Sequence, residues 1–69
     1  MSLLDAKAGE EYLIKTVEGK PKHRRFLESL GFQTGRSVTV LGLIGNCILV
    51  VLDGSRVAVP ETMAYAIMI

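Results

Sequence analysis

The segment RRFLESLGFQTG, residues 24–35, contains the signals for the end of a helix and the start of a strand. Pro21 can open the helix, because its φ is already helical and its missing N–H would have no partner in the first turn. Gly31 can close the helix in a left-handed conformation without a Cβ penalty, which makes Leu27 and Phe32 the hydrophobic pair of the helix end. The fold must therefore join one short helix to a sheet within a few residues.

The helix is expected to pack on the sheet through one face. His23 or Phe26, with Leu27 and Leu30, lies on roughly one helix face, because His23 is four residues before Leu27, Phe26 four before Leu30, and Leu27 three before Leu30. Phe26 and Phe32 are both expected in the interior.

The rest of the chain is typical of short strands separated by turns. Glu11–Val17 is β-prone with imperfect alternation, which is compatible with a bulge, and Cys47–Leu52 is a continuous apolar run suited to a central strand covered on both faces. Asp53-Gly54 is the strongest hairpin signal. The other expected elements are an N-terminal lid of Leu3, Leu4 and Ala6, a strand Ser37–Leu41, a turn Gly42–Asn46, a strand Arg56–Pro60, a helical turn from Pro60 to Tyr65 and a strand Ile67–Ile69.

Together these elements predict a mainly β fold. About five short strands, one short helix between the first two strands and a short helical turn near the C-terminus form a small, partly open SH3-like barrel. A chain of 69 residues is expected to be one domain, spanning residues 1–69.

One set of residues and spacings runs through most of the chain: Arg24, Arg25, Leu27, Leu30, Gly31, Gly35, Val38 and Val40, with a lead-in at Gly9–Val17 and the Asp53-Gly54 hairpin. This pattern resembles the FeoA family, the small cytosolic proteins of bacterial ferrous-iron uptake. The resemblance implies the same barrel fold. It also implies an accessory role in docking on the transporter FeoB, either on its cytosolic GTPase domain or on its membrane part.

Composition points to a reducing compartment. The single cysteine cannot form an internal disulfide, and the longest apolar strand is far shorter than the roughly 20 residues that span a bilayer. Asp5 and Lys7 follow Met1–Leu4 at once, so no apolar segment of a secretory signal is present there. We expect a cytoplasmic protein that meets the membrane only through its partner.

The sequence contains no recognisable catalytic set, and no enzyme activity or cofactor is expected. There is one His and one Cys, no closely spaced carboxylate pair and no phosphate-binding glycine motif. Cys47 and His23 could supply two metal ligands, but a zinc site usually needs four ligands, or three and a water, so two chains would have to share it. We therefore expect no metal site.

Two surface features are candidates for docking. Lys20, Lys22, Arg24 and Arg25 are half of the eight Lys and Arg residues, and Glu28 is spaced to pair with Arg24. Lys22, Arg24 and Arg25 could steer a partner, and Leu43 and Ile44 at a loop tip could form an apolar anchor.

Other functions remain open at this point. The basic residues could bind nucleic acid in a small barrel, although the low net charge and the few aromatic side chains argue against it, and no nucleic-acid partner is expected. A stand-alone relative of the SH3-like domain of iron-dependent repressors is a third hypothesis. An exposed edge at Ile67–Ile69 would allow self-association.

Overall fold

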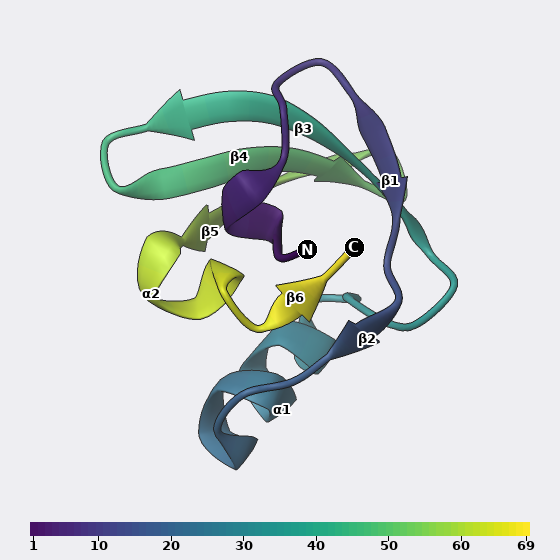
Figure 1. Cartoon of the computed structure of the whole chain (residues 1–69), viewed down its shortest axis with the longest axis vertical. Helices are drawn as coiled ribbons and strands as arrows, with labels where there is room; N and C mark the ends of the chain where they lie inside the picture. The colour runs from purple at the N-terminus through teal and green to yellow at the C-terminus, as the bar shows by residue number, and fades with distance from the viewer.

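The computed structural model describes all residues, 1–69, and contains two small antiparallel sheets (Figure 1). The larger sheet has the strand order β1-β3-β4-β5, and the smaller sheet pairs β2 with β6. The expected mainly β fold is confirmed, with six strands instead of about five. The elements in chain order are η1 (Leu3–Asp5), β1 (Glu11–Leu13), β2 (Thr16–Val17), α1 (Pro21–Ser29), β3 (Ser37–Ile44), β4 (Cys47–Leu52), β5 (Ser55–Pro60), α2 (Glu61–Ala64) and β6 (Ile67–Met68).

The expected first strand, Glu11–Val17, is two strands that belong to different sheets. The chain leaves the large sheet at Ile14, whose N–H donates to the carbonyl of Arg36 at 2.9 Å. It joins the small sheet one residue later, where the N–H of Lys15 donates to the carbonyl of Met68 at 2.7 Å. This change of partner explains the imperfect alternation, and it lets one segment hold both sheets together.

Helix α1 ends as predicted. Gly31 has φ +108°, its N–H donates to the carbonyl of Glu28 at 3.0 Å, and the N–H of Phe32 donates to the carbonyl of Leu27 at 3.2 Å. This is the hydrogen-bond pattern of a Schellman motif, with Leu27 and Phe32 both fully buried. Pro21 is the first helical residue, also as expected.

The predicted buried face of α1 is wrong in part. Leu27 is buried, but Phe26 and Leu30 are 44% and 38% exposed. The helix is nine residues long and reaches the core through one residue of its own and through Phe32 beyond its end. Phe26 and Leu30, which flank Leu27 on the helix, therefore remain partly in solvent.

Strand β3 runs three residues further than expected. The sequence favours a turn at Gly42–Asn46, but pairing with β4 continues to Ile44, and only Gly45 and Asn46 form the turn. The register shifts between Val40 and Gly42, so Leu41 is an extra residue in a β-bulge, and Gly42 has φ +151°. The glycine that suggests a turn lies in a bulge instead.

The β4–β5 hairpin is confirmed. Asp53 and Gly54 both have positive φ, 52° and 78°, as a type I′ turn requires. Strand β4 is central in the sheet, but only its inward side chains are fully buried, so the expectation of cover on both faces is wrong.

Strand β6 does not present the expected free edge. It pairs with β2 on one side, and Met68 bridges to Ser2 on the other. Ile67 and Ile69 are buried, and the N–H of Ile69 donates to the carbonyl of Met1 at 2.7 Å.

The core contains hydrophobic side chains alone and lies between the two sheets, η1 and α1. Because both sheets, all three helical elements and the turn after α1 contribute to it, removal of any of these parts would expose apolar surface. Its members are Leu3, Ile14, Val17, Leu27, Phe32, Val38, Val40, Ile48, Val50, Leu52, Val59, Ala64, Ala66, Ile67 and Ile69.

Candidate docking surfaces

An apolar hollow of about 310 Å³ opens between the N-terminal segment and the β3–β4 hairpin. None of its lining side chains is charged, and three of the lining residues, Leu3, Val40 and Ile48, belong to the core. The full lining is Leu3, Leu4, Ala6, Ala8, Val40, Gly42, Leu43 and Ile48.

Hydrogen bonds fix the N-terminal wall of this hollow. The Ser2 side chain accepts from the N–H of Leu4 at 3.2 Å, and the Ser2 N–H donates to the Asp5 carboxylate at 3.3 Å, which together cap η1. The N–H of Gly9 then donates to the carbonyl of Val40 at 2.7 Å. The wall is thus tied to β3, and the hollow exists without a partner.

Leu43 and Ile44 lie on opposite faces of the large sheet. Leu43 is the register partner of Ile48, a core residue, whereas Ile44 is the partner of Cys47 on the outer face. Both side chains are exposed, at 69% and 61%. Only Leu43 lines the hollow, so the two predicted anchor residues do not form one contact point.

The bulge at Leu41 is the reason for this arrangement. One extra residue reverses which side chains face inward beyond it. Without the insertion, alternation from the buried Val40 would place Leu43 outside and Ile44 inside. Sequence reasoning identified Leu3, Leu4 and Ala6 as a lid but did not bring them together with Leu43, because no signal in the sequence distinguishes the bulge from a turn.

The predicted basic residues lie on α1 and at its N-cap, away from the hollow. Lys20, Lys22, Arg24 and Arg25 are all exposed, and none takes part in an ion pair, because the one salt bridge of the protein joins Arg36 to Asp53. The expected pair between Arg24 and Glu28 is not formed. The charges on α1 are therefore free to meet a partner.

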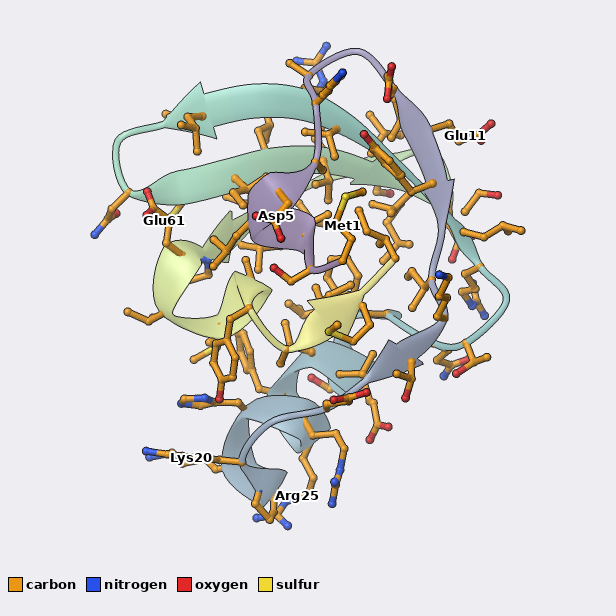
Figure 2. The ribbon with its side chains drawn as sticks, in the orientation of Figure 1. Met1, Asp5, Glu11, Lys20, Arg25 and Glu61 are labelled. Carbon is orange, nitrogen blue, oxygen red and sulfur yellow. The ribbon has the colours of Figure 1, made fainter.

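The two surfaces lie at different ends of the molecule. In Figure 1, α1 forms the lower end, and the β3–β4 hairpin lies at the upper left. Figure 2 shows Lys20 and Arg25 pointing away from the sheets at the α1 end. A single small contact cannot include both surfaces.

His23 and Cys47 do not meet in a metal-binding cluster. The His23 ring lies on α1, where Nδ1 is 3.3 Å from the Tyr65 hydroxyl, and Cys47 begins β4 beside Asn46. No group of three or more His, Cys, Asp or Glu residues is arranged to hold a metal ion.

Membrane insertion by a helix finds no support in the structure. None of the helices has both the length and the apolar character to cross a bilayer.

Comparison with protein families gives a match over the whole chain. The model of the FeoA domain matches residues 1–69. No curated protein matches the sequence.

Solved structures of FeoA proteins share the fold. The NMR structure of the FeoA protein from Chlorobium tepidum has a TM-score of 0.86 and 30% identity, over 99% of this chain and 67% of that chain. The zinc complex of FeoA from Stenotrophomonas maltophilia has a TM-score of 0.84 and 22% identity, over 99% of this chain and 87% of that chain. The latter protein is described as a prokaryotic SH3 domain protein and a candidate activating factor of ferrous iron transport.

A manganese-dependent transcriptional repressor contains the same fold within a longer chain. The TM-score is 0.87 at 21% identity, over 97% of this chain and 39% of the repressor. At this identity the likeness concerns the fold alone, so it adds no argument for a regulatory role.

Proposed function

The chain belongs to the FeoA family, and from this premise we propose that it is an accessory protein of bacterial ferrous-iron uptake that docks on the cytosolic, GTPase-bearing part of FeoB. In this proposal it acts in the cytoplasm as an adaptor, without catalysis of its own. The description of the Stenotrophomonas maltophilia relative as a candidate activating factor supports the role in transport.

The observation that carries the docking proposal is the apolar hollow beside Leu43. Its volume of about 310 Å³ is at the lower end of the range for small-molecule pockets. It lacks the charged groups that would orient a polar ligand. An apolar side chain from a partner segment fits these properties better than a cofactor does, and such anchors dominate the energy of many interfaces.

The adjacent residues Leu43 and Ile44 allow a matched test. Leu43→Asp introduces a charge into the wall of the hollow, whereas Ile44→Asp introduces the same charge on the opposite face of the same strand. Since both side chains are exposed, both variants are expected to fold. We expect Leu43→Asp to weaken docking roughly 30-fold, the effect of losing a hot-spot contact of about 2 kcal/mol. The effect of Ile44→Asp should be severalfold at most.

The measurement is an NMR titration of isotope-labelled protein with the purified cytosolic domain of FeoB, with and without guanine nucleotide. Signals of η1, Ala8 and the β3–β4 hairpin should shift on binding. Equal loss of binding in the two variants would remove the hollow from the proposal. Absence of any shift at high partner concentration would refute docking on that domain.

A further inference from the structure

The charge of the molecule is polarised along its length. Residues 20–30 contain four of the eight Lys and Arg residues but one of the seven Asp and Glu residues, although the whole chain has a net charge of +1. The other residues therefore carry four cations and six acids. In Figure 2, Lys20 and Arg25 lie at the α1 end, while Asp5, Glu11 and Glu61 lie in the upper part of the view. An anionic surface would attract the α1 end and repel the remainder.

An exposed apolar pair lies beside these charges on α1. Lys22, Phe26 and Leu30 are four residues apart and form one row along the helix, and Arg25 and Ser29 form the next row. Phe26 and Leu30 are exposed although Leu27, one position away, is buried. The side of α1 that faces away from the core thus carries apolar side chains and cations in two adjacent rows.

We propose that α1 is a membrane-contact surface that lies on a bilayer of anionic lipids, with Phe26 and Leu30 in the interfacial region. Lys22 and Arg25, which lie in the same row as Phe26 and in the adjacent row, contact the lipid headgroups. The helix forms one end of the molecule, so it can approach a flat surface ahead of both sheets (Figure 1). This contact is direct, and it does not rest on the docking proposed above, since no transporter takes part.

The apolar pair favours a bilayer over the other anionic partners. Nucleic acid would use the cations for phosphate contacts, but exposed Leu30 would have no stacking role there. Interfacial helices place aromatic and leucine side chains in the boundary region and Lys or Arg at the headgroups, as α1 does. A contact of this size is weak and depends on anionic lipid, so it is reversible.

Vesicle binding provides the test. The chain has no tryptophan, so Phe26→Trp supplies a single indole on the proposed surface, which can be excited apart from the two tyrosines. Leu13→Trp supplies a control on β1, where Leu13 is 63% exposed. With vesicles of phosphatidylglycerol and phosphatidylcholine, the indole emission of the Phe26→Trp variant should shift to the blue, and that of the Leu13→Trp variant should stay unchanged. Vesicles of phosphatidylcholine alone should leave the indole emission of both variants unchanged, and added salt should reverse the blue shift of the Phe26→Trp variant.

Charge reversal distinguishes α1 from the remaining basic residues. A double variant that carries both Lys22→Glu and Arg25→Glu should bind anionic vesicles roughly 25-fold more weakly or worse, as measured by co-sedimentation. The reason is that each basic residue contributes about fivefold to the affinity near an anionic surface. In the matched control variant, the charges of exposed Lys7 and Arg56, which lie outside α1, are reversed instead. This control should bind the vesicles much more strongly than the α1 variant. Circular dichroism checks that each variant is folded.

Three results would overturn the proposal. The first is no binding of wild-type protein to the anionic vesicles, and the second is equal loss in the two charge-reversal variants. The third is stronger binding to an RNA or DNA oligonucleotide than to vesicles, with no effect of Phe26→Ala, which would assign α1 to nucleic acid. None of these results bears on docking at the hollow.

Discussion

Gly19 lies in the loop before α1, beside the ring of Tyr65. Its φ is +85°, and a Cβ atom built there would be 2.8 Å from the Tyr65 hydroxyl. The same hydroxyl is 3.3 Å from Nδ1 of His23, and the two rings meet edge to face with centroids 6.1 Å apart. The contact between His23 and Tyr65 joins the start of α1 to the end of α2, and the absence of a Cβ at Gly19 leaves room for the Tyr65 ring.

Substitution of Gly19 should therefore be more costly than that of other loop glycines. Gly19→Ala adds a steric clash to the strain of a positive φ, so we expect a loss of more than about 1 kcal/mol in the free energy of unfolding. Gly9→Ala is the matched control, because Gly9 has φ +88° and no atom within 4 Å of its Cβ position. Urea unfolding of both variants measures the difference, and equal losses would show that the contact with Tyr65 has no part in it.

At the scale of the element, predictions succeeded where the signal is local. The end of α1 at Gly31 and the turn at Asp53-Gly54 follow from backbone conformations that few residues adopt, so the sequence identifies both. The wrong predictions concern which strands pair with each other. Whether Gly42 turns the chain or lies in a bulge depends on the register with β4, and Glu11–Val17 divides because its two halves pair with strands distant in sequence.

The candidate site was predictable only in its parts. The exposed basic residues and the exposed Leu43 and Ile44 could be named from the sequence, because charged and misplaced apolar side chains stand out there. Their division into separate surfaces could not be predicted from the sequence, since it depends on which face of β3 each side chain occupies. The exposure of Phe26 likewise depends on how little of α1 touches the core.

Strand β6 is short but should be indispensable. Its segment contributes Ile67 and Ile69 to the core and pairs with β2. Loss of a buried isoleucine side chain costs about 2–5 kcal/mol, and the total stability of such a domain is only about 5–15 kcal/mol. Deletion of Ile67–Ile69 should therefore leave an unfolded chain with a collapsed amide NMR spectrum. Met68→Ala, at a half-buried position of the same strand, should remain folded, and a dispersed spectrum of the deletion variant would contradict this expectation.

The whole molecule presents two proposed contact surfaces that differ in chemistry and direction. The hollow beside Leu43 is apolar and uncharged, and the surface of α1 is basic with an apolar margin. Because the surfaces lie at different ends (Figure 1), one copy of the protein could engage a bilayer and a transporter domain at the same time. The two contacts would then reinforce each other through a raised effective concentration.

The meeting of the two chain ends makes the backbone almost a closed ring. The N–H of Ile69 donates to the carbonyl of Met1 at 2.7 Å, and the termini lie side by side in Figure 1. A short Gly-Ser linker could join them with little change to the native structure, while the unfolded chain would lose conformational freedom. Loop-closure entropy gives an upper limit of about 4 kcal/mol for this stabilisation. A cyclised form should thus unfold at a higher urea concentration than the linear chain with the same linker appended, and an unchanged midpoint would mean that closure strains the ends.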